Sequence, residues 1–218
     1  MSAGQSATPG APATFDAVTL DGYGTLLTIR DPIGHLDREL RSRGVELTPA
    51  VIKRGFAAEG AYYTEAKVSA GDAESLSALR LECARVFLQT VGAELDPADF
   101  TSALVYEFDV LPGVPSALAR LTAHGFALAL VANWDVGLHE HLRAAGLAPY
   151  FSTVVVSAEL GVAKPDPRPF LEALERLGVE PGRTVHIGDR ATDEEGAAAA
   201  GLQYLPAPLE HAVRGWLG

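Results

Sequence analysis

The stretch Phe15-Asp-Ala-Val-Thr-Leu-Asp21-Gly22-Tyr23-Gly24-Thr25-Leu-Leu27 decides the fold of this 218-residue chain. An apolar β run ends in the carboxylate of Asp21, and glycines stand on both sides of Tyr23 directly after it. Open α/β sheets bind ligands at the carboxyl ends of their strands. The stretch therefore predicts a strand that delivers one carboxylate to such an edge, where it can act as a nucleophile.

The second half of the chain alternates between short β runs and helical segments. From Val114 onward we expect strands at 126–132, 153–156, 184–187 and 203–205, and helices at 115–124, 136–145, 167–177 and 193–200. Helices of this length between short β runs imply right-handed crossovers and a parallel sheet. The predicted fold class is therefore α/β, with a Rossmann-like parallel sheet as its core.

The block 31–109 reads differently, because we find no β run between Arg30 and Asp109. Capping residues predict four helix starts, three of them followed by proline: Asp31-Pro32, Thr48-Pro49, Asp72 and Asp96-Pro97. We therefore expect an all-helical cap domain at 31–109, inserted into a core domain made of 15–30 and 110–218. Residues 1–14 are too poor in bulky side chains to pack, and we expect a disordered tail there.

Composition narrows the choice of partners. The formal net charge of −11 argues against nucleic acid or an anionic membrane as the main partner, but a small anionic metabolite is compatible with it. The single cysteine, Cys83, cannot form an internal disulfide and is expected to be buried among apolar residues. Without a signal-like N-terminus or a membrane-length apolar run, we expect a soluble cytoplasmic protein, either monomer or homodimer.

Three further polar stretches follow β runs, as Asp21 does. The first is Asn133-Trp134-Asp135, the second is Gly161-Val-Ala-Lys164-Pro-Asp166-Pro, and the third is Gly188-Asp189 with Asp193 four residues later. Because parallel strands end at one edge of the sheet, we expect Asp21, Asn133, Lys164 and Asp189 to surround one cleft between core and cap.

These four stretches together resemble the motifs of the haloacid dehalogenase-like (HAD) hydrolases, over nearly the whole of 15–205. The inserted block is similar to the helical cap of one large subgroup. The resemblance implies that Asp21 is the nucleophile, that Thr25 orients it, and that Lys164 neutralises the nucleophile and the substrate anion. It also implies a Mg²⁺ site formed by Asp21, the Tyr23 carbonyl, Asp189 and Asp193, although Asp193 could instead orient Lys164 or cap its helix.

Two positions depart from the family's phosphatases. The second aspartate of the first motif is Tyr23, and the hydroxyl residue of the second motif is Ala132. The candidate substrate-binding residues are Gly22, Asn133 and Trp134. The Asn133 amide could donate to the substrate or cap the next helix, and Trp134 could line the entrance or cover the core.

Charge favours a metal-dependent reaction. The carboxylates of Asp21, Asp189 and Asp193 would converge against the single ammonium of Lys164, which is unfavourable in a partly dry site. A hard divalent cation such as Mg²⁺ removes this imbalance. We therefore favour a Mg²⁺-dependent hydrolase of small phosphorylated metabolites, slowed by the missing second aspartate.

Tyr23 keeps two other hypotheses open. A phenol with a pKa of about 10 can donate a proton but is a poor base near neutral pH. A halide leaves without a proton, and the 2-haloacid dehalogenases read Asp-Ala-Tyr-Gly-Thr at this motif, although their later tyrosine is Phe170 here. The second hypothesis is therefore a dehalogenase, and the third is a catalytically weak protein that binds a phosphorylated ligand.

Overall fold

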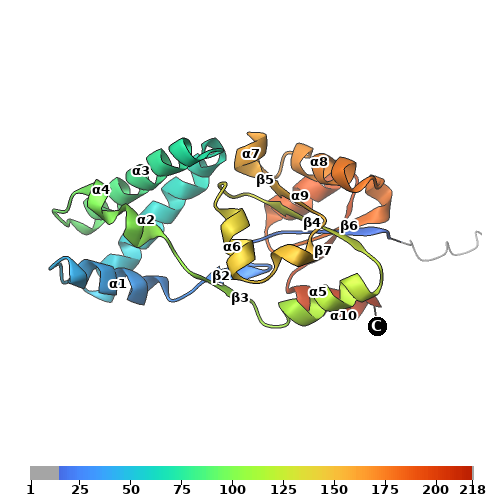
Figure 1. Cartoon of the computed structure of the whole chain (residues 1–218), viewed down its shortest axis with the longest axis horizontal. Helices are drawn as coiled ribbons and strands as arrows, with labels where there is room; N and C mark the ends of the chain where they lie inside the picture. The colour runs from blue at the N-terminus through green and yellow to red at the C-terminus, as the bar shows by residue number, and fades with distance from the viewer. Residues whose placement is uncertain (1–14, 218) are drawn as a thin grey trace, which may run out of the picture.

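The computed structural model describes residues 15–217, so the tail expected at 1–14 lies outside the described residues. Figure 1 shows two bodies: a helical cap and an α/β core. The core sheet has five parallel strands in the order β5-β4-β1-β6-β7. Their bounds are Ala17–Leu20 (β1), Ala127–Ala132 (β4), Thr153–Val156 (β5), Thr184–Gly188 (β6) and Gln203–Pro206 (β7). The predicted parallel α/β sheet is confirmed.

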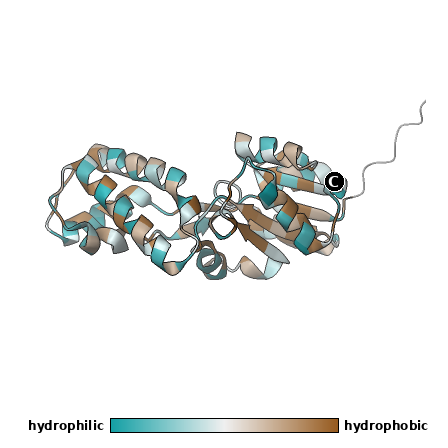
Figure 2. Ribbon diagram, turned by 90° about the horizontal axis from the view of Figure 1, so that it is seen from above, coloured by the Kyte–Doolittle hydropathy of each residue, from teal (hydrophilic) through white to brown (hydrophobic). Residues whose placement is uncertain are grey.

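Helices cover both faces of this sheet. On one face lie α5 (Val114–Ala123), α6 (Leu138–Ala144) and α10 (Leu209–Leu217), and on the other lie α8 (Arg168–Leu177) and α9 (Ala191–Ala199), with the short α7 (Ser157–Leu160) after β5. Alternate residues of β4 serve the two sides, because Leu128 and Leu130 pack with the first group and Ala129 and Val131 with the second. Strands buried on both faces need such continuous apolar runs, which appear as brown arrows in Figure 2.

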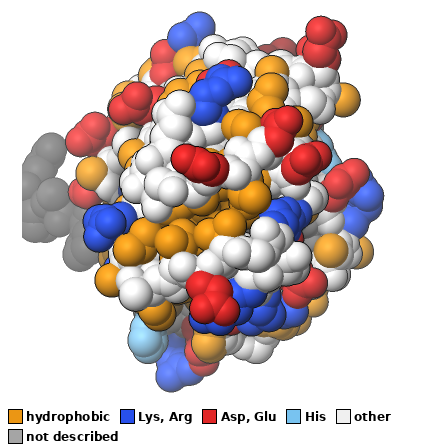
Figure 3. Space-filling model, turned by 90° about the vertical axis from the view of Figure 1, so that its left-hand side faces the viewer, with side chains coloured by type: hydrophobic (Ala, Val, Ile, Leu, Met, Phe, Trp, Pro, Cys, Tyr) orange, Lys and Arg blue, Asp and Glu red, His pale blue; other side chains and the backbone are white. Residues whose placement is uncertain are grey.

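The cap contains α1 (Pro32–Ser42), α2 (Pro49–Ala66), α3 (Ala73–Val91) and α4 (Pro97–Phe100), with 3₁₀ turns at Lys67–Ser69 and Thr101–Leu104. All four predicted helix starts are confirmed, and the Asp72 carboxylate accepts the backbone N–H of Ser75 at 2.8 Å. The cap has its own apolar cluster, which includes Leu36, Ile52, Phe87 and Phe100. Its outer end carries charged side chains of both signs around apolar ones (Figure 3). Within 15–217 no helix has the length and apolar character to cross a membrane.

Two short strands that the sequence did not predict connect the bodies. Strand β2 (Leu27–Ile29) pairs antiparallel with β3 (Phe108–Val110), and neither joins the main sheet. Strand β3 therefore begins inside the block that we expected to lack a β run. Three residues give too short a pattern to detect, and their partners lie about 80 residues away in the chain. Arg30 reinforces the pair through ion pairs to Glu107 and Asp109.

The close contact between α2 and α3 at Gly55 provides a test of how the cap helices pack. A methyl group at Gly55 of α2 would collide with the side chains of Phe87 and Val91 on α3, whereas nothing lies within 4 Å of one at Gly60 on the same helix. We predict that Gly55→Ala lowers the free energy of unfolding by about 1–3 kcal/mol, because overpacking strains a core. The matched control Gly60→Ala should raise it by about 0.5–1 kcal/mol, because alanine favours a helix. Urea denaturation measures both, and equal effects would contradict the packing.

Candidate active site

Lys164 is the centre of the site. Its ammonium donates to Asp21 Oδ1 at 2.6 Å, to Asp193 Oδ1 at 2.5 Å and to the carbonyl oxygen of Val131 at 2.7 Å. Only 4% of Lys164 is exposed. Burial opposes its charge, but the two carboxylates outweigh burial and raise the pKa of Lys164. The ammonium is therefore a fixed positive charge beneath the Asp21 carboxylate.

The backbone of Lys164 is fixed by Asn133, at the end of β4. The Asn133 amide nitrogen donates to the carbonyl oxygen of Lys164 at 2.9 Å, and the Lys164 N–H donates to Asn133 Oδ1 at 2.8 Å. The side chain does not cap α6, which begins at Leu138 without a side-chain cap. Asn133 also lines the pocket described below, where a substrate could reach it. Its contact with a substrate stays a prediction.

Asp193 has both of the structural roles that the sequence left open. One carboxylate oxygen accepts from Lys164, and the other accepts the backbone N–H of Arg190 at 3.0 Å, at the start of α9. The buried ring of His186 lies 3.3 Å from the first oxygen, and its other nitrogen lies 2.9 Å from the Thr19 hydroxyl. Burial opposes the Asp193 charge, but His186 and Lys164 lower its pKa below the usual range.

Three carboxylates meet next to Lys164. Asp21, Asp189 and Asp193 each offer an oxygen, and these oxygens lie within 4.8 Å of one another. Burial, followed by the charge of Asp21, raises the pKa of Asp189. Gly24 has a φ of 85°, and any side chain there would collide with the Asp189 carboxylate. Hard oxygen donors with surplus negative charge fit Mg²⁺, while a contribution from the Tyr23 carbonyl stays a prediction.

Thr25 and Gly22 are two further residues of the first motif for which the sequence predicted a role in the site. The Thr25 hydroxyl is buried and has no hydrogen-bond partner among residues 15–217, so Asp21 is held by Lys164 instead. The predicted orienting role of Thr25 therefore stays a prediction. A Cβ atom at Gly22 would lie 3.5 Å from the Trp134 ring, an ordinary van der Waals contact, so the packing leaves room for a small side chain there. The predicted substrate contact of Gly22 stays a prediction.

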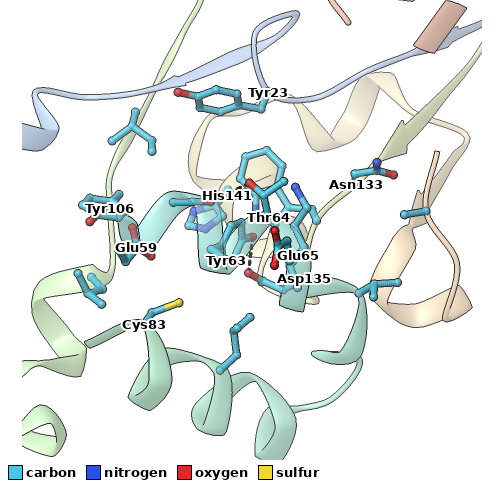
Figure 4. Close-up of a pocket in the computed structure, with 18 of the residues that line it drawn as sticks. Tyr23, Glu59, Tyr63, Thr64, Glu65, Cys83, Tyr106, Asn133, Asp135 and His141 are labelled. Atoms are coloured by element: carbon cyan, nitrogen blue, oxygen red, sulfur yellow. Dashed lines mark hydrogen bonds between the residues drawn. The ribbon is translucent and has the colours of Figure 1, made fainter. Parts of the chain in front are cut away.

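Tyr23 occupies the position of the family's second aspartate. Its ring meets Trp134 edge-on, with centroids 6.3 Å apart, and the Arg190 guanidinium lies 5.9 Å from the ring centroid. The residue is 37% exposed and lines the pocket, on the opposite side from the cap residues in Figure 4. A phenol can therefore contact a bound substrate from the core side.

A cavity of about 670 Å³ lies between the core and the cap. Of the four residues expected at one cleft, Asp21, Asn133 and Lys164 line it from the core, together with Asp193. The fourth, Asp189, is not among the lining residues, but its carboxylate lies within 4.8 Å of those of Asp21 and Asp193. The cap is docked over the cavity by a hydrogen bond from the Tyr63 hydroxyl to the Asp135 carboxylate at 2.7 Å, drawn dashed in Figure 4. Any substrate of Asp21 is thus enclosed by cap side chains.

Comparison with known proteins agrees with this geometry. The model of the haloacid dehalogenase-like hydrolases matches residues 15–201. The chain belongs to this family of hydrolases. A Bos taurus relative, haloacid dehalogenase-like hydrolase domain-containing protein 3, is 30% identical over 215 residues, which cover 90% of this chain and 85% of that protein.

Two further similarities concern proteins with named activities. A glyceraldehyde 3-phosphate phosphatase of Methanopyrus kandleri is 36% identical over 126 residues, about half of either chain (54%). The L-2-haloacid dehalogenase of Xanthobacter autotrophicus superposes with a TM-score of 0.66 at 25% identity, over 88% of this chain and 76% of that one. The chain is therefore similar over about half of its length to a phosphatase, and over most of its fold to a carbon–halogen hydrolase.

Sequence reasoning missed two ionisable residues that line the HAD pocket from the cap. Lys67 follows α2, and burial, followed by the charge of Arg190, lowers its pKa to about 8. Glu59 on α2 is 5% exposed, and burial raises its pKa to about 7. Glu59 stands three residues after Phe56 and four before Tyr63, so its place on an apolar helix stripe was the available signal.

Replacing Lys164 tests the electrostatic centre. We predict that Lys164→Met lowers the free energy of unfolding by about 3–5 kcal/mol in EDTA, because it leaves buried carboxylates without a counter-charge. The matched control Lys53→Met removes an exposed lysine of α2 and should change stability by less than about 0.5 kcal/mol. Equal stabilities of the two variants in urea denaturation would contradict the account of this cluster.

Proposed function

We propose that this enzyme hydrolyses small phosphate monoesters in a Mg²⁺-dependent reaction, with Asp21 as the nucleophile. The observation that carries the proposal is the Asp21 carboxylate held by Lys164 at 2.6 Å, with Asp189 and Asp193 clustered around it at the base of the pocket. Mg²⁺ at these carboxylates would neutralise charge on the phosphoryl group. HAD phosphatases act on small phosphorylated substrates, and the Methanopyrus kandleri relative is named as one for glyceraldehyde 3-phosphate.

The reaction divides into two displacements at phosphorus. Asp21 Oδ1 accepts a hydrogen bond from the Lys164 ammonium, whereas Oδ2 accepts none among the described residues. We therefore propose Oδ2 as the attacking atom. Its attack forms an O–P bond and breaks the ester O–P bond, and the leaving alkoxide takes a proton. Water then attacks the same phosphorus, which releases phosphate and regenerates the Asp21 carboxylate. Lys164 stays protonated throughout and offsets the accumulating negative charge.

Lys67 and Arg190 are the groups that we propose to bind the phosphate in place of the hydroxyl that is missing at Ala132. Lys67 and Arg190 both line the pocket, and the charges of Arg190, Asp21 and Lys164 all act on Lys67. A phosphate dianion bound at Asp21 would therefore lie near a lysine from the cap and an arginine from the core. We propose that they bind the phosphoryl oxygens, a contact that forms only when the cap is closed.

Tyr23 is the proposed proton donor to the leaving alkoxide. Its phenol reaches the pocket from the same loop as Asp21, but it is a weak acid and a poor base near neutral pH. The phenolate that remains takes a proton from the attacking water in the second displacement, which returns Tyr23 to the phenol. The first displacement is therefore the impaired step, because a phenol is a weaker acid than the carboxylic acid it replaces, and general acid catalysis is worth roughly 10²–10⁴-fold. We expect slow turnover, with the poorest leaving groups affected most.

Tyr23 also supports a second candidate, attack of Asp21 on the carbon of a 2-haloacid. A halide leaves without a proton, so the absence of the second aspartate does not slow the departure of the leaving group in that reaction. The likeness to the Xanthobacter autotrophicus dehalogenase agrees with it. Asp189 and Asp193 favour the phosphatase, because their negative charge would repel a carboxylate substrate unless a cation were present.

Restoring the second aspartate separates the two reactions. We predict that Tyr23→Asp raises the Mg²⁺-dependent kcat for an alkyl phosphate by up to roughly 10²-fold, because it restores an acid–base group. EDTA or Asp21→Asn should abolish turnover in both backgrounds, since an amide is not a nucleophile. Release of halide from 2-haloacids in EDTA, with no phosphatase activity in either protein, would instead establish the second candidate.

The pH dependence of kcat/KM tests Lys67. Because the pKa of Lys67 is lowered to about 8, its ammonium is present below that pH and is lost as pH rises through it. We predict that kcat/KM for a phosphate ester falls above about pH 8. Lys67→Met should lower kcat/KM by about 10- to 100-fold and remove this alkaline decline. An unchanged decline in Lys67→Met would show that another group causes it.

A further inference from the structure

The cap end of the pocket contains a buried carboxyl group that the proposed reaction does not use. Glu59 is 5% exposed and faces the cavity from the middle of α2. Burial and a hydrogen bond with the Cys83 thiol are the two influences on its ionisation, and no cation of the described residues is among them. A buried carboxylate is normally paired with a positive group. Glu59 therefore lacks a counter-ion that its position calls for.

A hydroxyl group without a hydrogen-bond partner lies beside Glu59. The Tyr106 hydroxyl is buried and neither accepts nor donates a hydrogen bond within 15–217, and burial, followed by the charge of Glu59, raises the pKa of Tyr106. Figure 4 shows Glu59, Tyr106 and Cys83 together at one end of the pocket, away from Asn133. Leaving a buried polar group unpaired costs about 1–3 kcal/mol. An unpaired hydroxyl beside a buried carboxyl group that no cation pairs, both facing one cavity, indicates a ligand that pairs with them.

The surrounding side chains indicate the charge of that ligand. The rings of Phe56 and Tyr106 meet edge-on at 5.7 Å, and Tyr63, Phe108 and Trp134 also line the cavity. Aromatic faces attract cations, most strongly where water is excluded. The cations that line the cavity have other partners. Lys67 lies 5.3 Å from the centroid of the Tyr63 ring and interacts with the charges of Asp21 and Arg190, and Arg80 lies near Asp135. The rings of Phe56, Tyr106, Phe108 and Trp134 have no lysine or arginine over them among the described residues. The pocket thus has a phosphate end, where Lys67, Arg190 and Lys164 lie among the carboxylates, and an aromatic, acidic cap end.

We propose that the leaving group of the substrate carries an ammonium group, with Glu59 as its counter-ion and Tyr106 as a further hydrogen-bonding partner. The substrate is then a zwitterionic phosphomonoester with a largely apolar body, which suits a cavity of about 670 Å³ with mostly aromatic and aliphatic walls. This assignment rests on the proposed function, because it takes the phosphoryl group to be bound at Asp21. It agrees with the pKa of Glu59, which burial raises to about 7 and an ammonium ligand would lower.

Three aryl phosphates of nearly equal size test the assignment. They are 4-(aminomethyl)phenyl phosphate, 4-(hydroxymethyl)phenyl phosphate and 4-ethylphenyl phosphate, which differ only in an ammonium, a hydroxyl or a methyl group at one position. Their dissociation constants are measured by calorimetry with Asp21→Asn, which cannot turn them over. We expect the ammonium ester to bind about 10- to 100-fold more tightly than the ethyl ester, the usual worth of a charged hydrogen bond.

Two variants in the Asp21→Asn background locate the effect. Glu59→Gln keeps the shape of the side chain and should remove the preference for the ammonium ester while leaving the ethyl ester's affinity unchanged. Glu65→Gln makes the same substitution at an exposed position of α2 that also lines the cavity, and should leave the preference intact. Thermal melting shows whether Glu59→Gln is folded.

The outcomes separate the ammonium assignment from the proposed reaction. Equal binding of the three esters, preference for the hydroxyl ester, or an ammonium preference that survives Glu59→Gln would overturn the ammonium assignment, even if the natural enzyme hydrolyses all three. Glu59-dependent selectivity without Mg²⁺-dependent turnover by the natural enzyme would support the assignment and overturn the proposed reaction. If Asp21→Asn binds none of the esters, both claims are overturned.

Discussion

The contact between the Lys164 ammonium and two buried carboxylates is the constraint on which the rest of the site depends. Asp21 comes from the end of β1, Asp193 from α9 and Lys164 from the loop before α8. Each of these charges would be costly to bury alone, so the three elements are stabilised in one arrangement and destabilised in others. The same contact holds the proposed nucleophile next to a fixed positive charge. Structure and chemistry therefore rely on the same three side chains.

The cap supplies what the core lacks. The core offers carboxylates, one buried ammonium and a phenol, and it has alanine where HAD phosphatases have a hydroxyl. Lys67 and Glu59, both from the cap, add a cation near Asp21 and an acid farther away. The Tyr63–Asp135 hydrogen bond and a backbone hydrogen bond from Val136 to Ala70 are among the contacts that join the cap to the core. Under the proposed function, substrate recognition is therefore divided between the cap and the core, which must be docked together.

The sequence predicted the residues at strand ends well, for a physical reason. A parallel sheet brings the carboxyl ends of its strands to one edge, so an apolar run followed by Asp21, Asn133 or Asp189 fixes both the place and the neighbours of that side chain. The role of Asn133 was not predictable in this way. Its bonds to the backbone of Lys164 depend on the path of a loop, and loop paths have no periodic signature.

The cap residues were harder to predict. Helix starts at Pro32, Pro49 and Pro97 are local signals and were confirmed. The orientation of Glu59 and Lys67 depends on how α2 docks over the core, which is a long-range property with no local signal. The pair β2–β3 shows the same limit, because its two three-residue strands are stabilised by each other and by Arg30 across the insertion.

The central claim is that Asp21 attacks phosphorus, and trapping the covalent intermediate tests it most directly. The natural enzyme is mixed with Mg²⁺ and an excess of an activated phosphate ester, quenched in acid within one turnover, digested and analysed by mass spectrometry. The account predicts a phosphoryl group on the side chain of Asp21, absent in Asp21→Asn and in EDTA. Release of phosphate with an unmodified Asp21 throughout the turnover, or an organic acid esterified to Asp21 after incubation with a 2-haloacid, would contradict it.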